Sequence, residues 1–470
     1  MLEADAHGRV RRVFPAQAPP TPGAPPPEDL GAVALVPGLQ NAHSHAFQRA
    51  LRDRTEFEPA DAPGVVRPAG DFWSWRDRMY RVALALSPEE VEALSAQTFL
   101  EMARAGITAV GEFHYLHHGP DGRPYADANA LAHRVIAAAR RVGVRIHLLR
   151  VLYHRAGPGR IAEPEQRRFI DADVQVALGR VSDLATGWAH DPGVRVGVAP
   201  HSVRAVPGAW LRATAEFAAA TDRAVHLHAC EQRRELAESR AEYGAEPVAV
   251  LAEHGLLTPR TTLVHATHLD ATALELLAAH RPTVCACPTT ERNLGDGFLP
   301  AAALLARGVP IALGSDSQAR IDPWEELRLV EGHARLQAEK RNVLAAFAPI
   351  DGRARRATAA ALWPMATEHG RRALAGPGEG PSVPDGPAEA STRPLAPGSV
   401  ADFVSLDLHD PALLGTTADS LVTALCFSMG PQAVRGVWVG GRPIVVDGRH
   451  PEGPAIARDF LRVMARLATV

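Results

Sequence analysis

Short apolar runs alternate with longer amphipathic stretches through the middle of the chain, and this alternation constrains the fold more than any other feature of the sequence. Most of the short runs are rich in Val, Ile, Leu and Ala without polar alternation, which is typical of strands buried on both faces. The longer stretches, such as Pro88–Ala105 and Ala130–Val142, have the apolar spacing of helices. Strands that alternate with helices in this way predict parallel pairing.

The number of strand candidates favours a closed barrel over an open sheet. Further helical patterns lie at Ala209–Ala220 and Asp270–His280. Eight parallel strands that alternate with helices form a (β/α)8 barrel, so we predict a distorted TIM barrel. The eight candidates are Val33–Val36 with its neighbours, Thr108–Phe113, Arg145–Leu152, Val194–Ala199, Ala224–His228, Thr262–His265, Thr283–Cys287 and Pro310–Gly314.

The two ends of the chain predict a second, smaller unit. Strand patterns at Arg9–Phe14, Ala401–Leu406 and Val434–Val446, the last with a turn at Gly440-Gly441, favour a small β-sandwich-like appendage built from both ends. The expected division is an N-terminal part of the appendage at 1–35, a metal-dependent barrel at 36–375, a Pro/Gly-rich linker at 376–398, and the C-terminal part of the appendage with a terminal helix at 399–470.

Composition excludes several classes of protein. Hydrophobic residues at 46% and charged residues at 22% are typical of a soluble globular enzyme. A net charge of −3 gives no basis for binding nucleic acid or a membrane surface. The four cysteines are too few for a disulfide scaffold, and no apolar run approaches the ~20 residues of a membrane span. Since Met1–Arg12 also has no apolar signal segment, we expect a cytoplasmic protein, and by base rates a homodimer.

Polar residues at the predicted strand ends indicate a metal site. The first strand leads into Asn41-Ala42-His43-Ser44-His45, and histidines two residues apart on extended chain face the same side. Such a pair is a weak signal alone, but strand-end residues follow in order around the barrel. Catalytic groups of TIM barrels lie at the C-terminal ends of the strands, and several imidazoles with a carboxylate suit Zn²⁺ with one position open for water. The later strand-end residues are His228, His265 and Asp316.

Two histidines compete for the position at the end of the fifth strand. His226 and His228 point to the same face, but only one can lie at the barrel mouth. We favour His228, because Glu231 follows it and could act as an acid or base beside the metal. His226 is expected to be a core histidine with its hydrogen bonds satisfied.

The number of metal ions follows from the lysine content. Barrels of this type that hold two metals need a bridging group, commonly a carbamylated lysine on a middle strand. The only lysine here, Lys340, comes after the eighth strand on an expected helix. We therefore expect one metal ion per chain.

These residues resemble the amidohydrolase superfamily in its single-metal deaminase branch, and most closely the formimidoylglutamate deiminases within it. The metal motif is shared by the whole superfamily, whereas the Phe-Trp-Ser-Trp-Arg, Phe-His-Tyr and His-Ser-Val-Arg pieces are narrower. The segments that carry the resemblance are Pro37–Ala50, Phe72–Arg76, Glu112–His118, Ala199–Arg204, His228–Gln232, Cys287–Glu291 and Gly314–Ser317.

The resemblance implies a role for each site residue. It implies one zinc on His43, His45, His228 and Asp316, and acid, base or water-polarising roles for Glu231, His265 and Asp316. It implies that the substrate is held by Gln48, Arg76, Tyr115, His201 and Arg204. Arginines at strand ends also suit a small dicarboxylate, because each can bind a carboxylate in two-pronged fashion. Gln318 stands where many relatives have histidine, so we expect the rim of the pocket to differ there.

The implied activity is the hydrolytic deimination of N-formimidoyl-L-glutamate to N-formyl-L-glutamate and ammonia in histidine degradation. One alternative is another single-metal deaminase acting on an aminated purine, pyrimidine or triazine ring, whose pocket would need aromatic stacking and no arginine pair. Opening of a cyclic amide is a further alternative with the same metal. A non-catalytic zinc-binding barrel is a different class, but it predicts loss of the acid and base groups, and Glu231 and His265 are both present.

Overall fold

A computed structural model describes residues 2–14, 26–56, 72–375 and 395–468 of the chain. Most of the predicted Pro/Gly-rich linker, 376–394, lies outside the described residues. Within them, no helix is both long and apolar enough to cross a bilayer.

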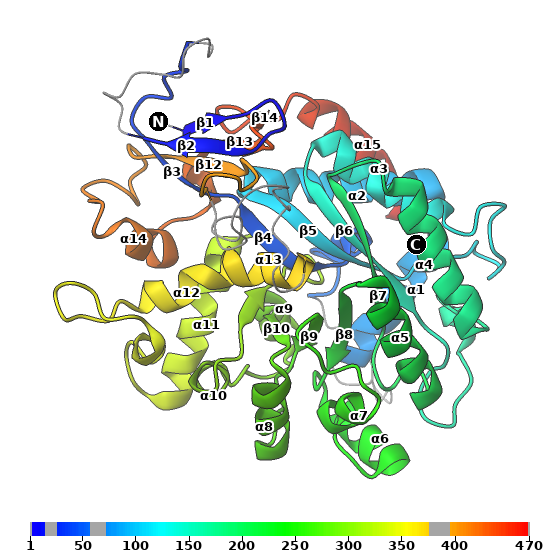
Figure 1. Cartoon of the computed structure of the whole chain (residues 1–470). Coiled ribbons are helices and arrows are strands. Elements are labelled where there is room, and N and C mark those ends of the chain that lie inside the picture. Colours follow the sequence, from blue (N-terminus) through cyan, green and yellow to red (C-terminus); the bar gives the residue numbers. More distant parts are fainter. Residues whose placement is uncertain (1, 15–25, 57–71, 376–394, 469–470) are drawn as a thin grey trace, which may run out of the picture.

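Eight parallel strands form the centre of the molecule, as predicted (Figure 1). Each strand pairs with its neighbour in chain order, and the sheet closes where Ser44 bridges to Asp316. The fold is therefore the expected distorted TIM barrel. Its strands are β4 (Leu39–Ser44), β5 (Ile107–His114), β6 (Arg145–Leu152), β7 (Val194–Pro200), β8 (Val225–Ala229), β9 (Thr261–His265), β10 (Thr283–Ala286) and β11 (Ile311–Leu313).

Helices surround these strands, and their ends follow local sequence signals. Ser87 and Glu90 form a capping box that starts α2, and Gly143, with a φ of 88°, ends α3. The helices after the β4 segment are α1 (Phe72–Ala85), α2 (Pro88–Arg104), α3 (Ala130–Val142), α4 (Val174–Trp188), α5 (Gly208–Thr221), α6 (Arg233–Tyr243), α7 (Pro247–Glu253), α8 (Ala271–His280), α9 (Pro288–Leu294), α10 (Ala301–Ala306), α11 (Pro323–Ala338), α12 (Thr358–Ala366) and α13 (Glu368–Ala375).

The prediction for the first barrel strand is wrong. The run at Val33–Pro37 is β3, and it pairs antiparallel with β12 (Phe403–Asp407) outside the barrel. The barrel begins at Leu39, directly after Gly38, whose position leaves no room for a side chain because a Cβ there would lie 2.3 Å from Thr108 Oγ1. The run was misassigned because β3 is apolar, whereas β4 carries the polar site residues.

The predicted appendage from both chain ends is confirmed. A four-stranded antiparallel sheet has the order β14-β13-β12-β3, where β13 is Val434–Val439 and β14 is Arg442–Val445. Gly440 and Gly441 make the turn between β13 and β14 with φ values of 57° and 71°. Figure 1 shows these strands beside the N-terminal hairpin of β1 (Leu2–Ala4) and β2 (Val10–Val13).

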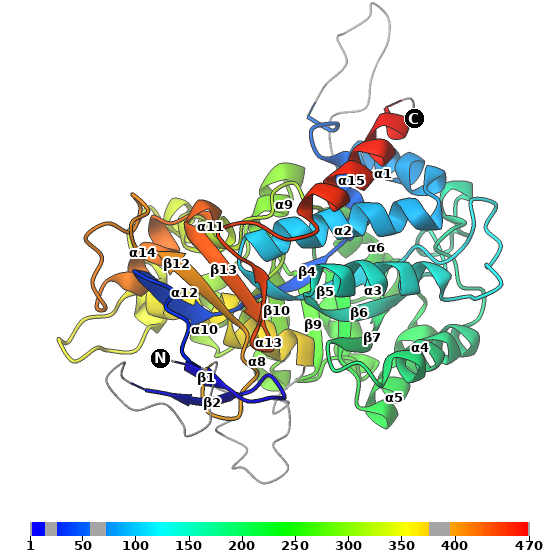
Figure 2. The same ribbon diagram turned by 90° about the horizontal axis from the view of Figure 1, so that it is seen from above.

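Two further helices complete the C-terminal part of the chain. They are α14 (Leu421–Phe427) and the terminal helix α15 (Gly453–Leu467), which packs along α2 (Figure 2). Arg466 fastens α15 by donating a hydrogen bond to Ala85 O at 2.9 Å.

Candidate metal centre and active site

The seam that closes the barrel lies at the candidate metal centre. Between β4 and β11, His45 N donates to Asp316 O at 3.0 Å, and Asp316 N donates to His43 O at 3.1 Å. Gly314 permits this approach, since a Cβ at that position would lie 2.8 Å from His43 Cβ and 2.9 Å from His43 O. Closure of the barrel and placement of three predicted ligands therefore depend on the same backbone contacts.

Side chains hold the same seam from within. Asn41 Oδ1 accepts from Ser315 N at 3.0 Å, and Asn41 Nδ2 donates to Ser315 Oγ at 2.7 Å. Gln318 Nε2 donates to Ser44 Oγ at 2.9 Å, and Gln318 Oε1 accepts from Ser315 Oγ at 2.9 Å. The expectation that Gln318 alters the pocket rim is wrong, because its side chain is fully buried in the seam.

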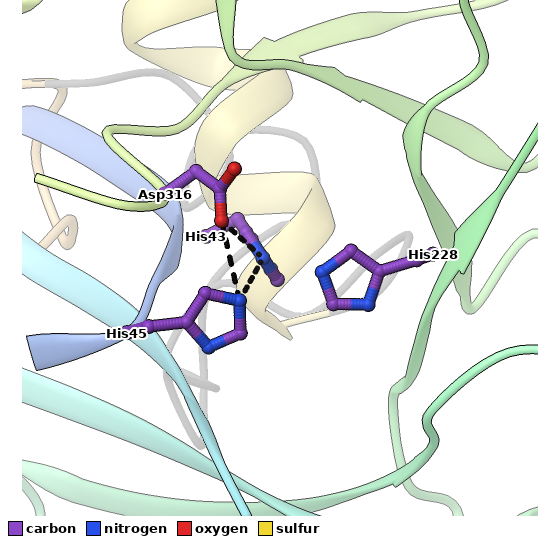
Figure 3. A group of neighbouring side chains, drawn as sticks. All are labelled: His43, His45, His228 and Asp316. Atoms are coloured by element: carbon purple, nitrogen blue, oxygen red, sulfur yellow. Dashed lines mark hydrogen bonds and ion pairs between the residues drawn. The ribbon is translucent and has the colours of Figure 1, made fainter. Parts of the chain in front are cut away.

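Four ligand atoms from the ends of three strands converge on one point. His43, His45, His228 and Asp316 are buried, and their candidate ligand atoms all lie within 4.8 Å of one another. Asp316 Oδ1 lies 3.3 Å from His43 Nε2 and 3.2 Å from His45 Nε2. Figure 3 shows these three side chains facing His228 across the centre.

The donor set fits a divalent metal. His45 Nδ1 lies 3.0 Å from Phe113 O and His228 Nδ1 lies 3.2 Å from His201 O. Because a carbonyl oxygen only accepts, each imidazole donates from Nδ1 and keeps the lone pair on Nε2. His43 Nε2 lies 3.2 Å from His45 Nε2, and burial lowers the pKa of His43 to about 3, so the ring is neutral. Neutral imidazoles with a carboxylate are the ligands that Zn²⁺ prefers in catalytic sites.

Glu231 and His265 lie beside Asp316, the carboxylate of the candidate ligand set. His265 Nε2 is 3.6 Å from Glu231 Oε1 and 3.7 Å from Asp316 Oδ2. His265 has a φ of 72° and Asp316 a φ of 42°, in the left-handed region that non-glycine residues seldom adopt and that is concentrated at active sites. Burial lowers the pKa of His265, but the carboxylates of Glu231, Glu291 and Asp316 raise it by more. The pKa of His265 therefore lies well above its usual value.

Glu291 is part of this site, although no role was predicted for it from the sequence. Its Oε1 accepts from Cys287 N at 2.8 Å and lies 3.4 Å from His265 Nδ1. A proton on Nδ1 therefore faces a carboxylate, and Nε2 of the same ring faces the pocket. The signal was present in the sequence, because Glu291 follows the seventh barrel strand in the first turn of α9.

A pocket opens over the metal centre and brings the predicted substrate residues together. Several aromatic side chains that had no predicted role also line it, among them Tyr80 and Tyr153. Its lining includes all five predicted substrate residues, which are Gln48, Arg76, Tyr115, His201 and Arg204. His45, His228, Glu231, His265 and Asp316 line the same pocket.

Other histidines lie apart from the pocket lining. His226 lies in the core as expected, with Nε2 2.8 Å from Ala373 O, but its Nδ1 has no hydrogen-bond partner among the described residues, so the expectation that its hydrogen bonds are satisfied is only half met. His117 Nε2 lies 2.8 Å from Val151 O, and His118 Nε2 lies 2.8 Å from Ile170 O. These contacts to main-chain oxygens are structural.

Comparisons with known proteins agree with this geometry. Residues 34–376 match the amidohydrolase family. The chain belongs to the amidohydrolase family. A formimidoylglutamate deiminase of Pseudomonas aeruginosa is 38% identical over 456 residues, which are 96% of this chain and 93% of that protein.

Two solved structures of the family are also similar. An amidohydrolase from Brucella melitensis has a TM-score of 0.85 and 33% identity, and the match covers 99% of this chain and 95% of that one. An adenosine deaminase from Xanthomonas campestris with bound zinc has a TM-score of 0.76 and 25% identity, with 99% and 93% covered.

Proposed function

We propose that this amidohydrolase hydrolyses N-formimidoyl-L-glutamate to N-formyl-L-glutamate and ammonia with one zinc ion. The observation that carries the proposal is a buried arginine, Arg204, that shares a pocket with the candidate metal centre and forms no ion pair with a carboxylate among the described residues. The Pseudomonas aeruginosa relative, named a formimidoylglutamate deiminase, supports the same substrate.

Among the described residues, the buried Arg168 also has no carboxylate partner, but it donates to three main-chain oxygens and does not line the pocket. The side chain of Arg204 donates, within the same described part of the chain, only to neutral oxygens, to Ala156 O at 3.2 Å and to Tyr153 OH at 3.5 Å. Arg150, by contrast, binds Asp171 in two-pronged fashion at 3.0 and 3.1 Å. Glu235 and Glu231 interact with the charge of Arg204 electrostatically, but no ion pair joins either of them to it. A substrate carboxylate would form the direct pair that Arg150 has with Asp171.

Arg76 is a second cation in the same pocket. Its Nη2 lies 3.6 Å from Glu163 Oε2, and its guanidinium lies 5.2 Å from the centre of the Tyr80 ring. Two cations suit a substrate with two carboxylates. An aminated ring would offer no anion to either cation, and this disfavours the alternative of a ring deaminase.

The candidate metal centre suits this reaction. When bound by His43, His45, His228 and Asp316, a zinc ion would lower the pKa of a water molecule towards ~7 and so supply a nucleophile at neutral pH. Zinc bound in the similar adenosine deaminase supports the choice of metal.

The side chains of Asp316 and Glu231 then transfer the protons of the reaction. Asp316 Oδ2 lies on the side of His265, whereas Oδ1 faces His43 and His45, so Oδ2 can accept the proton of the attacking water. Water adds oxygen to the formimino carbon, and a tetrahedral intermediate forms. Burial raises the pKa of Glu231, so its carboxyl can hold a proton and deliver it to the formimino nitrogen as the water adds. When the carbon–nitrogen bond breaks, the proton held by Asp316 passes to the same nitrogen, which leaves as ammonia, and the hydroxyl proton of the intermediate returns to Glu231 as the formyl C=O forms. His265 lies between the two carboxylates and orients both.

A panel of substrates tests the proposal. We expect zinc-loaded protein to release ammonia from N-formimidoyl-L-glutamate and to act at least a hundredfold more slowly on adenosine, guanine and a cyclic amide, since roughly 3 kcal/mol separates a satisfied from an unsatisfied buried charge. A higher kcat/KM on any ring amine would contradict the dicarboxylate pocket. The expected domain division, dimerisation and a cytoplasmic location stay predictions, which limited proteolysis, size-exclusion chromatography and cell fractionation would test.

A further inference from the structure

We propose that Gln166 is a positioning residue that makes Tyr80 and Tyr153 donate their hydroxyl protons into the pocket, where they bind a substrate carboxylate together with Arg204. The inference rests on the proposed function and deepens it, because it defines how one end of the substrate is selected. No role was predicted from the sequence for Gln166, Tyr80 or Tyr153.

The orientation of the Gln166 amide is fixed by the chain around it. Gln166 ends a short 3-10 helix, Pro164–Gln166, in the loop after β6, and it is fully buried. Its Oε1 accepts from Glu163 N at 2.8 Å, as one half of a capping box. With the oxygen held by a backbone N–H, the amide nitrogen must point the other way.

That nitrogen contacts both tyrosines. Gln166 Nε2 lies 3.1 Å from Tyr80 OH and 2.9 Å from Tyr153 OH. An amide nitrogen has two hydrogens and accepts nothing, so both phenol oxygens are acceptors in these bonds. Arg204 Nη1, 3.5 Å from Tyr153 OH, is a further donor to the same oxygen. Each hydroxyl proton is thereby excluded from this network and must point elsewhere.

The pocket is where those protons can go. Both tyrosines line it, with 3% and 2% of their surfaces exposed, and among the described residues neither hydroxyl has an acceptor for its proton. Burial and the neighbouring Tyr153 raise the pKa of Tyr80, so that phenol stays protonated at any physiological pH. Buried hydroxyls are almost always satisfied, and here a bound ligand would satisfy them.

The chemistry of this end of the pocket selects an anion with more than one oxygen. Two O–H donors and a guanidinium converge there, so a carboxylate finds three donors. A carboxamide would turn its NH₂ group towards donors that cannot accept, which leaves a buried hydrogen-bond donor unpaired. We therefore expect selection of carboxylate over carboxamide at one end of the substrate.

The experiment measures binding and turnover separately. Glutarate, a five-carbon dicarboxylate without a formimino group, is titrated into zinc-loaded wild type and into Tyr80→Phe, Tyr153→Phe and Gln166→Glu. Tyr125→Phe is the matched control, because Tyr125 contacts Arg168 and is not among the residues that line the pocket. Each variant is checked for metal content and thermal unfolding.

Each pocket variant should weaken glutarate binding about tenfold and raise the KM for N-formimidoyl-L-glutamate to a similar degree, with kcat within about twofold, as the loss of one hydrogen bond to a charged group predicts. Gln166→Glu keeps the shape but turns the two hydroxyl protons back towards residue 166. The preference for substrate over its α- or γ-carboxamide analogue should fall in all three variants and stay unchanged in Tyr125→Phe.

The failures are distinguishable. Unchanged glutarate binding in the three variants, or an unchanged preference for carboxylate over carboxamide, overturns the role of Gln166 while turnover by the wild type stands. No turnover by the wild type overturns the proposed substrate, and the glutarate titration still decides whether this end of the pocket binds a carboxylate.

Discussion

A substitution of Glu231 allows metal binding and catalysis to be measured separately, because Glu231 lies beside the metal centre and is not one of the four candidate ligands. Glu231→Gln should lower kcat by about 10²–10⁴-fold, the usual contribution of a general acid or base. Zinc content, measured by elemental analysis, should stay at one ion per chain. An active variant loaded with zinc would show that another group delivers the proton.

Glu291 should act through His265. Glu291→Gln keeps an oxygen for Cys287 N but removes the charge that faces His265 Nδ1, 3.4 Å away. We expect kcat to fall about 10–100-fold, as for other groups that orient catalytic or metal-binding histidines, with KM and zinc content nearly unchanged. Steady-state kinetics with metal analysis checks this. Loss of zinc in parallel with activity would assign Glu291 to metal binding instead.

For single residues, the sequence predicted the members of the site that lie at the C-terminal ends of parallel strands. Side chains at the C-terminal ends of parallel strands meet, and this rule brought His43, His228 and Asp316 together in advance. Tyr80 and Gln166 follow no such rule. The first lies on α1 and the second in a loop, and their meeting depends on a chain path that apolar periodicity does not describe.

The seam between β4 and β11 is the element on which the metal centre depends. Gly314→Ala would place a Cβ 2.8 Å from His43 Cβ, so the strands must separate or His43 must shift. We expect weaker zinc binding and a loss of about 1–3 kcal/mol in the free energy of unfolding, as for overpacked cores. Chelator competition and chemical denaturation measure the two effects.

A second glycine provides the control. Gly332 lies inside α11, and a Cβ there would meet nothing within 4 Å. Gly332→Ala should raise the free energy of unfolding by up to about 1 kcal/mol and leave zinc affinity unchanged. Equal effects of the two substitutions would show that the seam at Gly314 is not special.

Strand positions were predictable where strands are apolar, and not where they carry function. β5, β6 and β7 match their predicted runs closely because each is buried on both faces. β4 was missed because its polar residues hide the apolar pattern, and the neighbouring run of β3 was taken in its place. The partner of β3 is β12, far along the chain, and local sequence says nothing of such pairing.

The N-terminal ends of the barrel strands give the whole molecule a pH-dependent stability. His147 and His226 are buried there with ring centres 6.4 Å apart, and burial lowers the pKa of His226 to about 4 from 6.5. Below pH 6.5, His226 takes up a proton in the unfolded chain but stays neutral in the folded chain until the pH approaches 4. The stability from neutral His226 is therefore complete above pH 6.5 and is lost as the pH falls towards 4.

A substitution at this position tests the effect. His226→Gln keeps a donor for Ala373 O but cannot titrate. Between pH 7 and pH 5 the wild type should lose about 2 kcal/mol more of its free energy of unfolding than the variant, at 1.36 kcal/mol per pKa unit. Urea denaturation at both pH values measures the difference. Parallel losses in the two proteins would place the acid sensitivity elsewhere.

The central claim concerns the whole molecule, a barrel whose metal centre and cationic pocket act on one dicarboxylate amidine. The most direct measurement incubates zinc-loaded protein and chelator-treated protein with N-formimidoyl-L-glutamate and follows ammonia and N-formyl-L-glutamate together. We predict equal amounts of both products from the zinc-loaded protein, and none from the treated protein until zinc is restored. Ammonia release that is independent of metal, or no release at all, would contradict the account.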